Sequence, residues 1–135
     1  MAQPRTRVAA AVLGGPDPRA LAAFYQRLLG WNKVADEPAR RGAPPEDGWV
    51  MLRPPSGGTG LSFQYEPDYA PPVWPPAPGK QQIMAHLDIA VEDLEGGVTW
   101  ARDLGATLAD HQPQGQVRAM LDPAGHPFCL FPGPV

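Results

Sequence analysis

The chain contains one helical pattern twice, and this repeat constrains the fold more than any other feature of the sequence. Residues 17–30 and 93–105 each begin with an aspartate and end at a glycine. The aspartates lie 76 positions apart (93 − 17), and the glycines lie 75 apart (105 − 30). A short apolar run precedes each copy. Such a repeat predicts two copies of one supersecondary unit, whose sheets face each other across a concave cleft that suits a small molecule.

The two copies carry the start and stop signals of α-helices. Asp17 and Asp93 are good N-cap residues, and Pro18 fits a first helical turn because its missing N–H needs no partner there. Gly30 and Gly105 are expected stops. Apolar residues recur at helical spacing in each copy, namely Leu21, Phe24 and Leu28, and then Leu94, Val98, Ala101 and Leu104. Both copies are therefore predicted to form amphipathic helices.

Short apolar runs predict four strands around each helix. They cover residues 8–13, 31–34, 49–53 and 61–65, and then 84–91, 107–109, 117–121 and 127–131. Residues 14–17 are expected to break the first strand. The stretch 67–82 begins with one of its six prolines and cannot pair as a central strand, so it is interpreted as a linker. We expect one domain over residues 1–135, with module one at 6–66 and module two at 83–132.

Composition excludes several classes of protein. The chain has 135 residues, a net charge of −3 and no basic block, so neither nucleic acid nor a membrane surface is an expected partner. The apolar run at residues 8–13 is too short for a signal peptide or a membrane span. Cys129 is the single cysteine, which excludes an intramolecular disulfide. We therefore expect a cytoplasmic protein.

Several motifs in this order give the chain a family resemblance. They are Leu21-Ala-Ala-Phe-Tyr25 with Leu28-Leu-Gly-Trp31, then Leu61-Ser-Phe-Gln64, His86-Leu-Asp-Ile-Ala-Val91 and Leu121-Asp-Pro-Ala-Gly-His-Pro-Phe-Cys-Leu130. The chain resembles the vicinal oxygen chelate superfamily, which includes glyoxalase I, bleomycin-resistance proteins and extradiol dioxygenases. More closely, it resembles the glyoxalase-like domain group. The resemblance implies an α+β fold of two βαβββ modules, which form a half-open eight-stranded barrel with helices outside, and a homodimer.

The same resemblance implies four positions at which metal-dependent members carry ligands. Carried over to this chain, they are Ala10, Gln64, His86 and Cys129. Alanine has no ligand atom, an amide oxygen is a weak donor, and a thiolate suits hard ions poorly. We therefore expect no metal and no other cofactor. The alternative is a divalent metal ion held by His86, Gln64 and Cys129.

Strand alternation suggests which side chains line the cleft. Leu87, Ile89 and Val91 share one face of their strand, so His86 and Asp88 share the other. Two ionisable groups on a concave wall indicate a functional site, but they could equally pair with each other or with Arg118. Cys129 is either a small buried hydrophobic residue or the partner of His86 in a Cys–His pair.

The remaining candidates come from the first half of the chain. Trp49 and Met51 share a face that either looks into the cleft or belongs to the core. The predicted ligand-binding residues are Ala10, Trp49, Met51, Gln64, His86, Asp88, Arg118 and Cys129. Together they would form a mainly apolar site with a few polar groups, as is usual for organic molecules.

Two functions follow as hypotheses. The favoured one is a protein that binds a small apolar or aromatic molecule without metal, with a role in resistance or sequestration. The alternative is an enzyme of the same superfamily, a lyase, isomerase or dioxygenase, which uses either a metal or His86 as a base. A subunit without any ligand is the third reading, and a cleft filled by side chains would support it.

Overall fold

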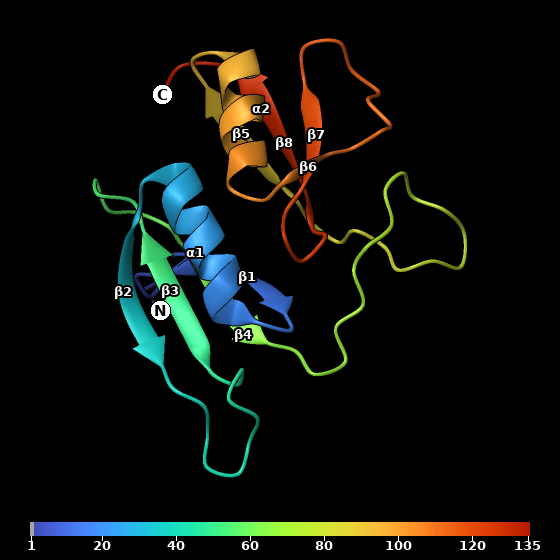
Figure 1. Cartoon of the computed structure of the whole chain (residues 1–135). Helices are drawn as coiled ribbons and strands as arrows, with labels where there is room; N and C mark the ends of the chain where they lie inside the picture. Colours follow the sequence, from blue (N-terminus) through green and yellow to red (C-terminus); the bar gives the residue numbers. More distant parts are fainter. Residues whose placement is uncertain (1) are drawn as a thin grey trace. The chain divides into compact units, whose positions relative to one another are not determined.

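The computed structural model describes residues 2–135, which form two compact units. The first unit ends at Pro67 and the second spans Asp68–Val135. Each unit contains a strand, a helix and three further strands, in that order (Figure 1). The repeat seen in the sequence is thus a repeat of structure, and the predicted α+β fold with two βαβββ modules is confirmed.

The first unit forms a four-stranded sheet in the order β1-β4-β3-β2. Strand β1 runs parallel to β4, whereas the other neighbours are antiparallel. The elements are β1 (Ala10–Gly15), α1 (Pro18–Leu29), β2 (Asn32–Glu37), β3 (Trp49–Arg53) and β4 (Gly60–Tyr65).

The second unit repeats this topology in the order β5-β8-β7-β6. Strand β5 again runs parallel to the last strand, β8, and the other neighbours are antiparallel. The elements are β5 (Leu87–Val91), α2 (Leu94–Asp103), β6 (Thr107–Leu108), β7 (Arg118–Leu121) and β8 (Pro127–Pro132).

Helix α1 begins and ends at the predicted residues. A side-chain oxygen of Asp17 accepts a hydrogen bond from the backbone N–H of Ala20 at 3.1 Å, which satisfies one of the free donors of the first turn. Gly30 adopts a left-handed conformation with φ 69°, and its N–H donates to Gln26 at 2.9 Å. The Asp93 side chain, in contrast, makes no cap hydrogen bond to α2.

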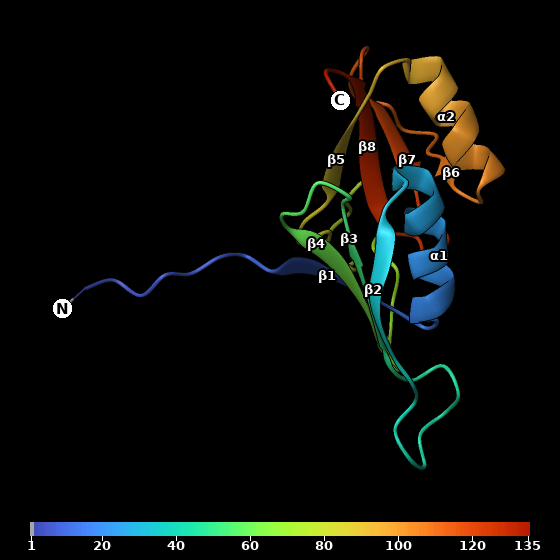
Figure 2. The same cartoon turned by 90° about the vertical axis from the view of Figure 1, so that its left-hand side faces the viewer.

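The core of the first unit lies between α1 and one face of its sheet. Tyr25 on α1 is fully buried and stacks on Phe63 of β4, with ring centroids 5.6 Å apart. Val50 and Leu52 of β3 are buried beside them. Figure 2 shows α1 on one side of this sheet. Within residues 2–67, no helix lies on the other side of the sheet.

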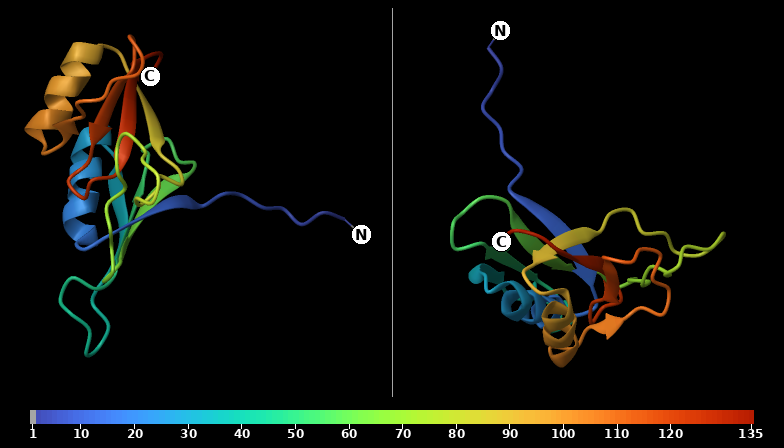
Figure 3. Two further views of the ribbon diagram at one scale, coloured as in Figure 1. Left: turned by 90° about the vertical axis from the view of Figure 1, so that its right-hand side faces the viewer. Right: turned by 90° about the horizontal axis from the view of Figure 1, so that it is seen from above.

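The core of the second unit has the same plan. Ala101 of α2, Met120 of β7, and Phe128 and Leu130 of β8 have no exposed surface. Helix α2 packs against β8 and β6, and the left view of Figure 3 shows it on one side of its sheet. Each unit is therefore a two-layer structure of one helix and one sheet.

Three predicted strands differ from the structure by two residues or more at a boundary. Strand β1 continues through Gly14 and Gly15, which pair with β4, and it stops only before Pro16, which has no N–H to donate. Strand β2 extends to Glu37 rather than residue 34, because it pairs with β3 along its length. Strand β5 begins at Leu87, because pairing with β8 starts there, so His86 lies just before the strand.

The proline-rich stretch 67–82 contains no helix or strand. From Asp68 onward it belongs to the second unit, where two aromatic side chains fasten it. The Tyr69 hydroxyl donates to the carbonyl of Ala124 at 2.7 Å, and Trp74 Nε1 donates to the carbonyl of His111 at 2.9 Å. Burial and the nearby Asp122 raise the pKa of Tyr69 to about 12, so the hydroxyl keeps its proton for this bond.

Candidate functional site

The helix-free face of the first sheet is defined by strand register. Val12 of β1 lies opposite Ser62 of β4, which lies opposite Met51 of β3. These residues alternate with the side chains that pack under α1, so they point away from the helix. Val12 is 51% exposed on this face. By the same register, the predicted residues Ala10, Trp49, Met51 and Gln64 share this face.

The helix-free face of the second sheet carries more polar chemistry. Asp88 of β5 lies opposite Cys129 of β8, which in turn lies opposite Ala119 of β7. Phe131 follows two residues after Cys129 and shares its face. The alternation expected from the sequence therefore applies here, with Asp88 turned away from the face that α2 covers.

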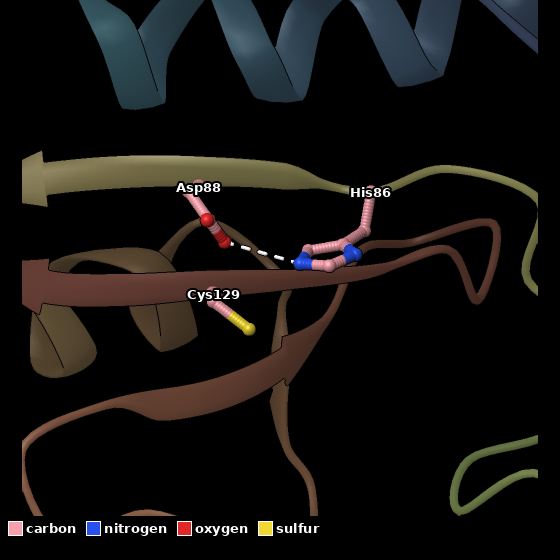
Figure 4. A group of neighbouring side chains, drawn as sticks. All are labelled: His86, Asp88 and Cys129. Atoms are coloured by element: carbon pink, nitrogen blue, oxygen red, sulfur yellow. Dashed lines mark ion pairs between the residues drawn. The ribbon is translucent and has the colours of Figure 1, made fainter.

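Three side chains form a cluster on this face. His86 Nε2 lies 3.1 Å from a carboxylate oxygen of Asp88. One ligand-type atom from each of His86, Asp88 and Cys129 can be chosen so that all three lie within 4.8 Å of one another. Figure 4 shows the first two residues on the β5 segment and Cys129 on the neighbouring β8. The sequence left open whether His86 and Asp88 pair with each other or with Arg118, and the structure contains the pair with each other.

Solvent access differs within the cluster. The side chains of His86 and Asp88 are 46% and 64% exposed, whereas Cys129 is half-buried. Burial, and then the negative charge of Asp88, raise the pKa of the Cys129 thiol. Since the thiolate is the nucleophilic form, the free protein holds Cys129 as an unreactive thiol at neutral pH. Although His86 lies close to Cys129, the raised pKa of the thiol argues against a Cys–His nucleophile pair.

The cluster lines an open hollow of about 340 Å³. The other lining residues are Gln114, Val117 and Phe131. An amide and two apolar side chains beside a His–Asp pair can bind a ring or an alkyl group and one polar substituent. The hollow lies wholly within the second unit.

Arg118 does not belong to this cluster, which corrects the prediction that placed it near His86 and Asp88. Because Ala119 is the register partner of Cys129, the adjacent Arg118 must point to the opposite face. It lies opposite the buried Leu130, and its guanidinium donates to the carbonyls of Gly115 at 2.9 Å and Val117 at 3.0 Å. Arg118 instead lines a separate hollow beside α2 with residues such as Leu94 and Val98.

The predicted residues of the first unit border a second hollow, of about 310 Å³. Trp49 and Gln64 line it together with the ion pair between Arg40 and Asp47. The Gln64 side-chain amide donates to Glu66 at 2.8 Å, so its oxygen remains available. Ala10 and Met51 lie on the same sheet face but do not line this hollow.

Register also changes which residue of β4 corresponds to Cys129; the sequence interpretation placed both Ser62 and Gln64 on the cleft face and chose Gln64. The parallel pairs end at Gly15 with Tyr65 in the first sheet and at Val91 with Pro132 in the second. Counting back from these ends, the residue that corresponds to Cys129 is Ser62, not Gln64. Ser62 is only 2% exposed. The 76-residue offset fixes the first strands, but the modules differ in length before their last strands, so that offset could not match Ser62 to Cys129.

The family assignment follows from the whole chain. A family model described as a glyoxalase-like domain matches residues 10–131, which include both modules. The chain belongs to the glyoxalase-like domain family. This family membership confirms the resemblance drawn from the motifs. No curated protein matches the sequence.

Solved structures share the fold at low sequence identity. A fosfomycin resistance protein, FosX, from Listeria monocytogenes in complex with Mn(II) and sulfate has a TM-score of 0.65 and 13% identity, and the match covers 100% of this chain and 96% of that chain. TnmS3, an antibiotic-binding protein from Streptomyces sp. CB03234, has a TM-score of 0.60 and 18% identity, and the match covers 98% of this chain and 100% of that chain. A bleomycin resistance determinant encoded on the transposon Tn5 has a TM-score of 0.57 and 22% identity, and the match covers 96% of this chain and 100% of that chain. At these identities the likeness shows the fold alone.

The residues of this glyoxalase-like protein do not fit a hard divalent ion such as Mn²⁺ at the four positions that the resemblance implies. Ala10 offers no donor, and Cys129 offers sulfur rather than the carboxylate oxygen that Mn²⁺ prefers. Neither Gln64 nor the buried Ser62 supplies a charged oxygen in the first module. Only His86 is an ordinary ligand among them. Three of the four positions therefore disagree with such a site.

Within residues 2–135, neither helix has the length and the apolar sequence that crossing a lipid bilayer would require.

Proposed function

We propose that this glyoxalase-like protein binds a small, largely apolar or aromatic organic molecule on a helix-free face of its sheets, and that this binding needs no metal. The role would be resistance or sequestration. The observation that carries the proposal is the composition of the helix-free faces. Val12 is half exposed on one, and Val117 and Phe131 line the hollow on the other. Exposed apolar side chains beside a few polar groups are typical of sites for organic ligands.

Two solved structures with this fold support the proposal that the protein binds an organic molecule. TnmS3 is described as an antibiotic-binding protein, and the protein encoded on Tn5 as a bleomycin resistance determinant. Neither identity is high enough to transfer a ligand. They support the class of function, and the poor fit of a hard ion supports binding without metal.

The test is calorimetry and thermal shift with a panel of aromatic antibiotics, bleomycin included, in the presence of a chelator. We expect at least one compound to raise the melting temperature with chelator present. Val12→Asp places a charge on the proposed surface and should weaken binding by about tenfold or more, equivalent to about 1.4 kcal/mol. Trp100→Asp is the matched control, because Trp100 is 46% exposed but lies on α2.

The proposal fails if no compound shifts the melt, if the chelator abolishes binding, or if Val12→Asp and Trp100→Asp behave alike. The homodimer and the cytoplasmic location belong to the same proposal. Light scattering after size-exclusion chromatography should give twice the 14.5 kDa mass of the chain. A monomer at all concentrations would remove the dimer without affecting ligand binding.

A second function rests on the His86–Asp88 pair. A carboxylate oxygen of Asp88 lies 3.1 Å from Nε2 of His86. With a proton on Nε2 held toward Asp88, Nδ1 would accept a proton from a substrate. In this reading the protein is a lyase or isomerase with His86 as the base and Asp88 as a positioning residue. Once a substrate is found, His86→Ala should abolish turnover, whereas Asp88→Asn should lower kcat and shift its pH profile.

A further inference from the structure

We propose that the second unit binds one zinc ion through His86, Asp88 and Cys129, a donor set drawn from one module rather than two. The site borders the hollow that the proposed organic ligand would use, but zinc is not required for the binding of that ligand. Asp88 is not among the four positions that the family resemblance implies, and it replaces the missing donors of the first module. The donors of this chain do not suit a hard ion such as Mn²⁺, and we infer that they bind zinc instead.

Backbone register places the three donors together. Strands β5 and β8 are parallel neighbours, and Asp88 lies directly opposite Cys129. His86 lies two residues before Asp88 and extends its side chain along the same face. Figure 4 shows the three side chains on this side of the strands. Strands β5 and β8 hold Asp88 and Cys129 rigidly, and His86 lies one residue before β5.

The distances are close to those of a tetrahedral site. Zinc binds nitrogen and oxygen at about 2.0–2.2 Å and sulfur at about 2.3 Å, which separates the donors of a tetrahedron by about 3.3–3.7 Å. The His86 nitrogen and an Asp88 oxygen are already 3.1 Å apart. A ligand-type atom of each residue can be chosen so that these two atoms and the sulfur of Cys129 lie within 4.8 Å of one another. Rotamer changes of about 1 Å would therefore complete the geometry.

Donor chemistry selects the ion. A thiolate with an imidazole and a carboxylate suits zinc, a borderline-soft ion, and it suits Mn²⁺ and Mg²⁺ poorly. Three protein donors leave the fourth tetrahedral position open, as in zinc sites that accept an external ligand. This open position would face the hollow lined by Gln114, Val117 and Phe131.

The experiment uses the full chain and metal ions alone. Competition titration with a chromogenic chelator should give one zinc per chain, with zinc preferred over Mn²⁺ by about a hundredfold or more. His86→Ala, Asp88→Ala and Cys129→Ser should each weaken zinc binding by about tenfold or more. His111→Ala is the matched control, because His111 is exposed in a loop outside the cluster, and it should leave affinity unchanged.

Cobalt gives a readout that a merely structural role would not produce. Cys129 is the only cysteine, so a thiolate-to-cobalt charge-transfer band in the near ultraviolet can arise only from Cys129. The band should be present in the unchanged protein and absent from Cys129→Ser, and circular dichroism should show that all variants are folded. The proposal is overturned if cobalt binds without this band, if zinc binds equally to His111→Ala and His86→Ala, or if light scattering shows zinc bridging two chains.

Discussion

The two modules share one topology but differ in what their helices bury and what their open faces carry. Helix α1 buries Leu21, Phe24 and Tyr25, whereas Ala101 is the buried residue of α2. The open face of the first sheet carries Val12, Met51, Ser62 and Gln64 and no ionisable group among them, whereas that of the second holds His86, Asp88 and Cys129. Helix-facing positions must stay apolar to form a core, whereas open-face positions have no such constraint. Duplication has therefore preserved register and allowed the chemistry of the open faces to diverge.

The largest expected effect tests whether the two cores are equally important. Phe63→Ala and Phe128→Ala each remove a ring with no exposed surface and should each lower the free energy of unfolding by about 3–5 kcal/mol. Urea denaturation followed by circular dichroism measures both. Val34→Ala, at a residue 51% exposed, is the control and should change stability by less than about 0.5 kcal/mol. If either phenylalanine variant lowers the free energy of unfolding by less than about 0.5 kcal/mol, the core assigned to its module is wrong.

The turns before the last strands provide the next comparison. A buried carboxylate oxygen of Asp122 accepts from the backbone N–H groups of Ala124 at 2.9 Å and His126 at 3.0 Å. Asp122→Ala leaves these donors without that acceptor and should cost about 2–3 kcal/mol in urea denaturation. Ser56→Ala, in the exposed turn of the first module, should cost less than about 0.5 kcal/mol. Equal losses would show that the two turns are stabilised alike.

Helix capping should show a smaller asymmetry. Asp17→Ala removes a hydrogen bond to Ala20 and should lower the free energy of unfolding by about 1 kcal/mol. Asp93→Ala removes no cap hydrogen bond and should cost only about 0.3 kcal/mol, from the lost charge at the helix N-terminus. Thermal melts of both variants beside the unchanged protein measure the difference. An Asp93→Ala loss as large as that of Asp17→Ala would contradict it.

The smallest effect concerns acid. Arg40 donates to Asp47 at 2.9 Å and lowers the pKa of that carboxyl to about 2 from an ordinary 3.8. Because the folded pKa is depressed, this stabilisation is complete above pH 3.8 and is lost as the pH falls through about 2. As the pH falls from 3.8 to about 2, the free energy of unfolding of Asp47→Asn should therefore decrease less than that of the unchanged protein. Exposure of Arg40 keeps the effect small. The measurement is the free energy of unfolding as a function of pH, with Asp110→Asn as the control. If Asp47→Asn leaves the slope of this dependence unchanged, the prediction is wrong.

Local signals in the sequence were sufficient for the elements and their order. Asp17, Pro18 and Gly30 define α1 through short-range hydrogen bonds and backbone preferences, which depend on neighbouring residues alone. Strand limits were less predictable because pairing decides them. Gly14 belongs to β1 since Gln64 lies opposite, and His86 falls outside β5 since pairing with β8 starts one residue later.

The candidate site was only partly predictable for the same reason. Alternation along one strand placed His86 and Asp88 on one face, but the sequence does not state which residue of β8 lies beside Asp88. Arg118 was misplaced, and Gln64 rather than Ser62 was matched to Cys129, because both assignments depend on registers set by partner strands. A shift of one residue reverses the face of every side chain on a strand.

The repeat, the helix caps and the family motifs are properties of the sequence itself, because they depend on spacing that folding does not alter. Tertiary structure alone decided that the imidazole, the carboxylate and the single thiol of this chain lie within 4.8 Å of one another. The physical reason is that backbone hydrogen bonds between β5 and β8 fix which residues become neighbours, and no local pattern encodes that pairing.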